Sequence, residues 1–241
     1  MDQEARGGSI VVTGGAGALG SALARRLVAA GHRVAIMGRP GDGAPLRALE
    51  AELGAACAGV GADVADEASW GAALAEIEAR VGPPAGAALI AGGWSGGVPL
   101  HAKGGGAAYR AMIEKNLDTA HASLRALLPG MVARKAGSVV LVGSRVAVRP
   151  ELGAGAAAYT ASKAAAVALA QAVAAEVLPH GVRVNAVLPS TIDTEANRRA
   201  MPDADPTRWV PLGSLAGVIA FLLSDDARDI SGAAILVYGR A

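Results

Sequence analysis

Short apolar runs of strand length alternate with longer, Ala- and Leu-rich helical patterns along almost the whole of this 241-residue chain. Strands that are separated by helices in this way usually lie parallel in one sheet, with the helices packed on both faces. The sequence therefore predicts an α/β fold with a doubly wound, seven-stranded parallel sheet, whose ligand crevice lies beyond the carboxyl ends of the strands. The predicted strands are residues 9–13, 33–37, 55–60, 87–91, 138–142, 183–188 and 233–238.

Length and composition favour one domain, residues 1–241, without an internal linker. The chain carries 22 basic and 21 acidic side chains, a net charge of +1, and no cluster of Lys or Arg. We therefore expect no nucleic acid and no membrane as a partner, but small molecules and copies of the same chain. A single cysteine, Cys57, and four scattered histidines give no metal-binding pattern, and the polar first nine residues lack the apolar core of a signal peptide. These features predict no metal site and a cytoplasmic location.

A glycine-rich turn follows the first predicted strand. Gly15, Gly17 and Gly20 have the spacing G-x-G-x-x-G and lead into a helical pattern. Glycines here let the backbone turn tightly and approach a pyrophosphate, whose charge is met by free N–H groups at the helix start. A turn of this kind can also bind nothing, but its position between a strand and a helix favours a dinucleotide site.

The end of the second predicted strand indicates which dinucleotide is preferred. In a nicotinamide-binding fold of this type, an acidic residue at this position holds the ribose 2′-hydroxyl of NAD. Here the sequence reads Met37-Gly38-Arg39, with no carboxylate. A guanidinium can bind a 2′-phosphate, so we expect NADP(H) to be favoured over NAD(H). The alternative is that Arg39 is a solvated loop residue.

A tyrosine and a lysine four residues apart, Tyr159 and Lys163, lie in a proline-free stretch, residues 156–177. This stretch predicts a helix, on which positions i and i+4 share one face. A nearby ammonium favours a phenolate, so we expect Lys163 to lower the pKa of Tyr159 and to make it a general acid for a carbonyl oxygen.

Together these features resemble the short-chain dehydrogenase/reductase family over essentially the whole chain. The glycine loop of that family, Thr-Gly-x-x-x-Gly-x-Gly, matches Thr13, Gly14 and Gly20, with Ala18 in place of the middle glycine. The Asp-Val pair that follows the third strand in the family matches Asp63-Val64. The resemblance implies a Rossmann-like fold, and it implies that Asp63-Val64 contacts the adenine of the cofactor.

The same resemblance implies the catalytic residues. The helix Asn, the Ser after the fifth strand and the Tyr-x-x-x-Lys motif of the family match Asn116, Ser144, Tyr159 and Lys163. By this likeness Ser144 holds the substrate oxygen, Tyr159 transfers the proton, Lys163 binds the ribose and Asn116 anchors a water. The simpler alternatives are that Ser144 is a turn hydroxyl and that Asn116 is an ordinary polar residue of a helix. The family's Asn-Asn-Ala-Gly turn is reduced to residues 89–92, Leu-Ile-Ala-Gly, so its asparagine contacts are missing.

A segment after the sixth predicted strand is similar to the one that cradles the nicotinamide in the family. Pro189 is followed by Ser190 in place of the usual glycine, and the likeness places Ile192 and Thr194 against the carboxamide. The full set of expected cofactor-binding residues is Gly14, Gly15, Gly17, Ala18, Leu19, Gly20, Arg39, Asp63, Val64, Ala91, Gly92, Tyr159, Lys163, Pro189, Ile192 and Thr194.

A second, narrower resemblance concerns the substrate. Residues 91–97 and parts of residues 187–209 look like the dihydropteridine reductase branch of the family, and residues 190–209 are expected to form a substrate lid. Trp94, Met201 and Trp209 are then pocket or lid residues, or else pack the lid against the body or a neighbouring subunit. The branch lacks the Ser and Asn that are present here as Ser144 and Asn116.

The resemblance therefore implies an NAD(P)-dependent oxidoreductase that reduces a ketone or aldehyde, or runs in reverse, and Arg39 favours NADPH as its cofactor. The alternatives are pterin reduction and, in a different class, a non-catalytic NADP-sensing regulator. Helical residues 109–134 and 156–178 carry small, Ala-rich faces, and the corresponding helices form subunit contacts in this family. A homotetramer is expected, with a dimer as the second choice.

Overall fold

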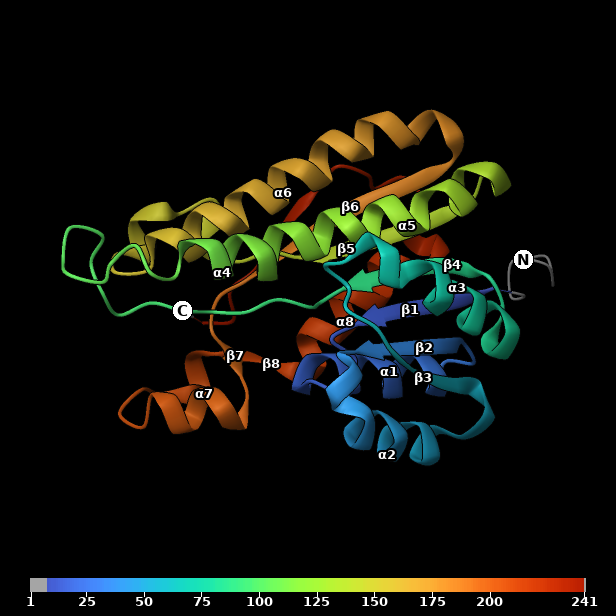
Figure 1. Ribbon diagram of the computed structural model, residues 1–241, viewed down its shortest axis with the longest axis horizontal. Helices are drawn as coiled ribbons and strands as arrows, with labels where there is room; N and C mark the ends of the chain where they lie inside the picture. Colours follow the sequence, from blue (N-terminus) through green and yellow to red (C-terminus); the bar gives the residue numbers. More distant parts are fainter. Residues whose placement is uncertain (1–7, 241) are drawn as a thin grey trace.

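The computed structural model describes residues 8–240 and contains one seven-stranded sheet with the strand order β3-β2-β1-β4-β5-β6-β9. Every pairing in this sheet is parallel, so the Rossmann-like, doubly wound prediction is confirmed (Figure 1). The strands are β1 (Ser9–Thr13), β2 (Arg33–Gly38), β3 (Cys57–Gly61), β4 (Pro84–Leu89), β5 (Gly137–Val142), β6 (Val182–Pro189) and β9 (Ala234–Val237).

The fourth strand differs most from its predicted bounds, residues 87–91, since it begins at Pro84 and ends at Leu89. The hydroxyl of Thr13 accepts hydrogen bonds from the backbone N–H groups of Ile90 (3.0 Å) and Ala91 (3.1 Å). These two donors are therefore taken by a side chain at the end of β1, and the chain leaves the sheet as a turn.

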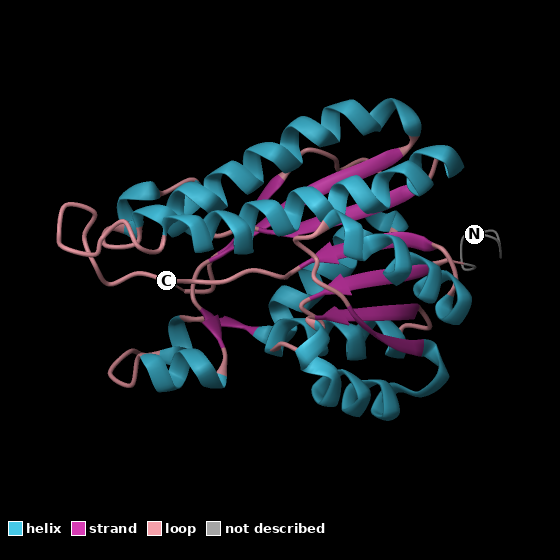
Figure 2. Ribbon diagram, in the orientation of Figure 1, coloured by secondary structure: helices cyan, strands magenta, loops and turns pink. Residues whose placement is uncertain are grey.

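Helices cover both faces of the sheet (Figure 2). Consecutive residues of β1 show why: Val11 packs in a core with α3, α5 and α6, whereas Val12 packs in a second core with α1, α2 and α8. Side chains alternate between the faces of a strand, so a sheet covered on both sides needs apolar residues at successive positions. The helices are α1 (Ala18–Ala29), α2 (Gly43–Leu53), α3 (Glu67–Val81), α4 (Tyr109–Ile113), α5 (Thr119–Arg134), α6 (Ala157–Val177), α7 (Glu195–Ala200) and α8 (Leu212–Leu223).

A π-helical turn, Glu114–Asp118, joins α4 to α5 without a break and carries Asn116. Such wide turns are rare in helices and occur frequently at functional sites. Helix propensity and apolar spacing do not distinguish them from an α-helix, so the sequence predicted only a continuous helix here.

A small two-stranded sheet, β7 (Ile192–Asp193) with β8 (Val210–Pro211), lies between β6 and α8. The strand arrowheads of the main sheet point toward the side of the molecule from which this small sheet and α7 project (Figure 1). Residues 190–209 therefore lie at the carboxyl edge of the main sheet.

Candidate active site

The glycine turn joins β1 to α1 at the carboxyl edge. A Cβ atom on Gly20 would collide with the carbonyl oxygen of Gly14, so only glycine allows the helix to start this close to the turn. The first helical residue is Ala18, and Gly17 before it offers no side-chain cap; the first turn also has no acidic residue. The free N–H groups and the positive end of the helix dipole are therefore not compensated by a carboxylate from the first turn of α1, which fits the pyrophosphate of a dinucleotide.

Arg39 lies directly after β2, with 81% of its side chain exposed. Its Nε is 3.4 Å from Oδ2 of Asp42, which also accepts a hydrogen bond from the Arg39 backbone N–H at 3.1 Å. Asp42 is a nearby carboxylate that the sequence reasoning missed. The separation of three residues across Pro40 was the available signal, since it allows a short helical turn that brings the two side chains together. The guanidinium is therefore exposed and forms an ion pair with one carboxylate, that of Asp42.

Asp63 and Val64 follow β3 at the same edge. The Asp63 carboxylate accepts a hydrogen bond from the backbone N–H of Ala65 at 3.0 Å, and Asp63 itself is exposed. Val64 is buried, and its carbonyl oxygen accepts a hydrogen bond from Nε1 of Trp70 at 3.2 Å. These contacts fix the loop and leave the second carboxylate oxygen of Asp63 without a protein partner among residues 8–240.

The turn after β4 is held by two side chains in place of the asparagines that it lacks. Besides Thr13, the Asn116 amide oxygen accepts from the N–H of Gly93 and its nitrogen donates to the Gly93 carbonyl, both at 3.0 Å. A Cβ atom on Gly92 would lie only 2.7 Å from Oδ1 of Asn116 and 3.3 Å from Nζ of Lys163. Gly92 therefore lets the turn lie directly against Asn116 and the Lys163 amine.

Asn116 also ties this turn to α6, because its side-chain nitrogen donates to the hydroxyl of Ser162 at 3.1 Å. Ser162 is fully buried and donates in turn to the carbonyl oxygen of Tyr159 at 2.8 Å. Sequence reasoning missed Ser162, which looks like an ordinary small helix residue. The contacts assign the Asn116 side chain to positioning β4's turn and α6.

The Tyr159 phenol and the Lys163 amine lie on one face of α6, as predicted, but the pKa prediction was wrong. Burial raises the pKa of Tyr159, and a hydrogen bond with Ser144 acts in the opposite direction. Lys163 is buried, donates to the carbonyl oxygen of Val142 at 2.9 Å, and has its own pKa lowered to about 8 by desolvation. Its amine is directed at the carbonyl oxygen of Val142 at the end of β5, and desolvation disfavours its charged form.

Ser144 follows β5 and is buried beside Tyr159. Fifteen residues separate the two along the chain, and the intervening segment turns back through a short helix, Pro150–Gly153. The positive φ of Gly155, +77°, completes this turn, and its carbonyl oxygen accepts a hydrogen bond from the N–H of Gly97 at 2.9 Å. The loop thus brings the hydroxyl and the phenol together and also packs against residues 93–108.

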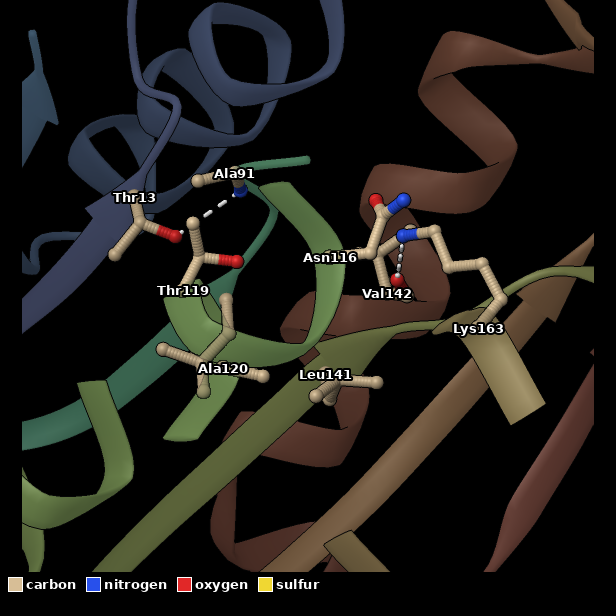
Figure 3. Close-up of a pocket in the computed structure, with 9 residues that line it drawn as sticks. Thr13, Ala91, Asn116, Thr119, Ala120, Leu141, Val142 and Lys163 are labelled. Carbon is tan, nitrogen blue, oxygen red and sulfur yellow. Dashed lines mark hydrogen bonds between the residues drawn. The ribbon is translucent and has the colours of Figure 1, made fainter. Parts of the chain in front are cut away.

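A small cavity of about 10 Å³ lies beneath this group and is lined by Thr13, Asn116, Thr119 and Lys163 together with apolar residues of β4, β5 and α5. Figure 3 shows the Thr13 hydroxyl directed at Ala91 and the Lys163 amine directed at Val142 on opposite sides of it. A volume of this size holds about one water molecule.

Pro189 ends β6, and the hydroxyl of Ser190 donates to the carbonyl oxygen of Tyr238 at 2.7 Å. Thr194 caps α7: its hydroxyl accepts from the N–H of Asn197 at 3.1 Å, while the Asn197 side chain donates to the carbonyl of Ile192 at 2.8 Å. These bonds give the segment after β6 a fixed shape, in which the Thr194 hydroxyl is used as a helix cap.

The three expected pocket or lid residues differ in how exposed their side chains are. Trp209 is buried beside β8, whereas Trp94 is 67% exposed and Met201 is 38% exposed. Of the three, only Trp209 packs against the body of the chain, whereas Trp94 and Met201 are exposed among residues 8–240.

The similarity of the chain to known proteins identifies its family. The model of the short chain dehydrogenases matches residues 9–205, most of the chain. The chain belongs to the short-chain dehydrogenase/reductase family. It is an NAD(P)-dependent oxidoreductase that interconverts carbonyl and alcohol groups of small molecules.

Three relatives illustrate the range of the similarity. "Inactive 2-(S)-hydroxypropyl-CoM dehydrogenase 2" of Xanthobacter autotrophicus is 37% identical over 90% of this chain and 98% of its own length. An acetoacetyl-CoA reductase of Synechocystis is 33% identical over 95% of this chain and 94% of its own length. A gluconate 5-dehydrogenase of Burkholderia cenocepacia, solved in complex with NADP and tartrate, has a TM-score of 0.85 at 28% identity and covers 97% of this chain and 94% of its own.

Within this short-chain dehydrogenase, the residues expected to bind cofactor or to catalyse lie at or next to the carboxyl ends of β1 to β6 or on α6, except Asn116, which lies on the π-helical turn between α4 and α5. One helical stretch, Ala157–His180, is long and apolar enough to cross a membrane by length and composition alone. It contains α6, which packs against β6 and carries Tyr159 and Lys163, so it is a core helix of the fold. Among residues 8–240 no group of three or more His, Cys, Asp or Glu is placed to hold a metal ion.

Proposed function

We propose that this enzyme reduces a ketone or aldehyde to an alcohol with NADPH, or catalyses the reverse oxidation. The observation that carries the proposal is the contact between Ser144 and Tyr159 at the edge where the glycine turn and Arg39 also lie. The acetoacetyl-CoA reductase relative, by its name, reduces a carbonyl group, which supports the same reaction class here.

The proposed roles combine the family resemblance with the positions of these side chains. The bound cofactor supplies the hydride that adds to the carbonyl carbon. Ser144 donates a hydrogen bond to the substrate oxygen, and Tyr159 transfers its proton to that oxygen as negative charge develops. The raised pKa of Tyr159 keeps the phenol protonated at neutral pH, as the reduction requires. Lys163 holds the cofactor ribose, and a water in the cavity beside Lys163 and Asn116 carries the replacement proton.

The Tyr159→Phe variant tests the proton donor. The substitution keeps the ring and its packing but removes the hydroxyl, and general acid catalysis is typically worth ~10²–10⁴-fold. With a panel of ketones and aldehydes, read by NADPH absorbance, we expect turnover to fall by about that factor while NADPH still binds. If the variant keeps more than about half of wild-type turnover when chemistry limits the rate, Tyr159 is not the donor.

The preference for NADPH rests on Arg39, which has no carboxylate partner but Asp42 within residues 8–240. Arg39→Ala should weaken NADPH binding by roughly 1.5–3 kcal/mol, the scale of a hydrogen bond to a charged group, and leave NADH binding nearly unchanged. Asp42→Asn is the matched control: it frees the guanidinium, so NADPH should bind at least as tightly as in the wild type. Titration that shows equal losses of both cofactors in Arg39→Ala contradicts this role.

Pterin reduction is the second candidate within this reaction class, and Ser144 distinguishes the two. An isolated carbonyl gains from a second donor aimed at its developing oxyanion, whereas a quinonoid dihydropterin accepts hydride at a conjugated imine. Ser144→Ala should therefore lower carbonyl turnover on the order of 10²-fold. Strong wild-type activity on quinonoid dihydropterin that is indifferent to this change, with none on carbonyls, would reverse the ranking.

A non-catalytic, NADP-sensing role remains a proposal of a different class, and one relative is named inactive. The complete set Asn116, Ser144, Tyr159 and Lys163 favours catalysis. Steady oxidation of NADPH by any substrate of the panel separates the two, because a sensor needs only to bind.

A further inference from the structure

Arg145 follows Ser144 directly and is partly buried. Within residues 8–240 its guanidinium has neither a carboxylate within 4.0 Å nor a hydrogen-bond acceptor. Arg149, four residues further along the same loop, is different: it is exposed and donates to Glu151 at 2.6 Å. A partly buried guanidinium without an anionic partner is costly unless another group compensates its charge.

The guanidinium of Arg145 lies over the ring of Tyr238, with its central carbon 5.7 Å from the ring centroid. This contact orients the planar group and leaves its N–H edge free to bind, which is how arginine commonly presents a fork to carboxylate or phosphate. The Tyr238 hydroxyl is buried and has no hydrogen-bond partner in the structure. Buried hydroxyls usually have one, so Arg145 and Tyr238 carry two polar groups that residues 8–240 leave without a hydrogen-bond or charged partner.

Both residues belong to the carboxyl edge at which the reaction takes place. Tyr238 comes directly after β9, whose Val237 pairs with Pro189 of β6, and the Tyr238 carbonyl accepts the hydroxyl hydrogen bond of Ser190. Arg145 is anchored beside Ser144, since consecutive Cα atoms are about 3.8 Å apart. The Arg145 side chain therefore starts at the same edge as Ser144, where the substrate carbonyl is expected to bind.

We propose that Arg145, oriented by Tyr238, forms a subsite for an anionic group of the substrate, so that the preferred substrates are short oxo acids or their hydroxy-acid products. The subsite rests on the proposed carbonyl reduction for its substrate, but not for its ability to bind. A carboxylate, a sulfonate and a phosphonate share the chemistry that a guanidinium fork recognises, and the spacing between carbonyl and anion selects among them.

The test compares each oxo acid with its neutral ester: acetoacetate with methyl acetoacetate and levulinate with methyl levulinate, with 2-oxopropane-1-sulfonate and 2-oxopropylphosphonate as the other anions. The wild type should favour at least one anion over the neutral esters in kcat/KM. In Arg145→Met, which keeps an unbranched side chain against the Tyr238 ring, that preference should fall about ten- to a hundredfold through KM. Turnover of the neutral esters should stay nearly constant.

Arg149→Met removes the same charge from the same loop and is the matched control, which should keep the preference for the anion. Arg145→Lys keeps the charge without the fork and should retain part of it. If Arg145→Met does not fold, as judged from its melting temperature, Arg145→Lys decides the question. Three results would overturn the subsite. The wild type shows no preference for anions, the folded Arg145 variant keeps the wild-type preference, or Arg149→Met loses the preference to the same extent as Arg145→Met.

Binding without turnover separates this proposal from the proposed function. The enzyme saturated with its reduced cofactor is titrated calorimetrically with 3-hydroxybutyrate and with its methyl ester, neither of which it can reduce. Tighter binding of the acid that depends on Arg145 supports the subsite even if no carbonyl is turned over. Equal affinity for acid and ester, or none for either, overturns it even if neutral ketones are reduced normally.

Discussion

At the scale of single residues, the burial of Lys163 links the site to the stability of the fold. The folded-state pKa of this amine is lowered from 10.5 to about 8, so the folded protein releases the proton at a lower pH than the unfolded chain. Between these two values the unfolded chain binds more protons, and the free energy of unfolding therefore rises with pH.

We predict that the wild type gains stability relative to Lys163→Met between pH 8 and pH 10, by roughly 1 kcal/mol per pH unit. Tyr159 and Cys57 have raised pKa values and act in the opposite direction at the alkaline end of this range. Both are present in the variant, so the difference between the two proteins isolates Lys163. Urea unfolding at several pH values measures it, and a difference that does not change with pH contradicts the buried-amine interpretation.

The sequence could predict which residues form the site but not the direction of their interactions. Tyr159 and Lys163 were recognisable because helix geometry fixes a spacing of four residues to one face. The direction of the Lys163 amine depends on the carbonyl of Val142, twenty-one residues away on another element, and spacing along α6 carries no information about it. The same holds for Ser162, whose role exists only because Asn116 on a different helix reaches it.

At the scale of elements, Gly17 and Gly20 in the turn from β1 to α1 are glycines for two different reasons. A Cβ atom on Gly20 would collide with Gly14, whereas a Cβ atom on Gly17 would meet only the Gly14 carbonyl oxygen, at 3.2 Å. Gly17 also has backbone angles that any residue adopts, φ −75° and ψ 168°. Gly20 thus serves the packing of the turn, and Gly17 is left free to serve a ligand.

We predict that Gly20→Ala lowers the melting temperature by several degrees, the scale of roughly 1–3 kcal/mol of overpacking in a chain of this size. Gly17→Ala should leave the melting temperature nearly unchanged but weaken cofactor binding about tenfold or more, because the added methyl group lies where the pyrophosphate approaches the helix start. Scanning calorimetry and cofactor titration give the two readouts. A Gly17→Ala variant with wild-type affinity would show that the backbone does not approach the phosphates there.

The elements themselves were largely predictable, because a sheet buried on both faces needs uninterrupted apolar runs. All seven predicted runs form strands of the sheet. The exceptions have local causes: β4 ends early since Thr13 takes its last N–H groups, and β7 and β8 are each too short to show a periodic pattern. The π-turn at Asn116 likewise depends on contacts with Gly93 and Ser162 that lie outside its own helix.

At the scale of the whole molecule, large apolar side chains remain exposed on several elements, among them β9, α8 and the end of α6. Leu236 on the edge strand β9 is 56% exposed, Phe221 on α8 is 45% exposed, and Leu178 at the end of α6 is 54% exposed. An edge strand with an exposed leucine is prone to associate with another chain.

We propose a homotetramer, with a dimer as the second choice, and predict a particle of four times the 23.7 kDa chain mass in light scattering at micromolar concentration. Leu236→Lys places a charge on the solvent side of the β9 edge, where the isolated chain tolerates it because the position is already exposed. In the assembly the same charge would be buried without a partner, which costs several kcal/mol per subunit contact. The variant should therefore dissociate to a smaller particle with an unchanged far-ultraviolet circular dichroism spectrum. A wild-type monomer refutes the assembly. A Leu236→Lys variant that stays tetrameric would show that the subunit contact does not involve β9, and the Ala-rich faces of α5 and α6 would then be the expected contact.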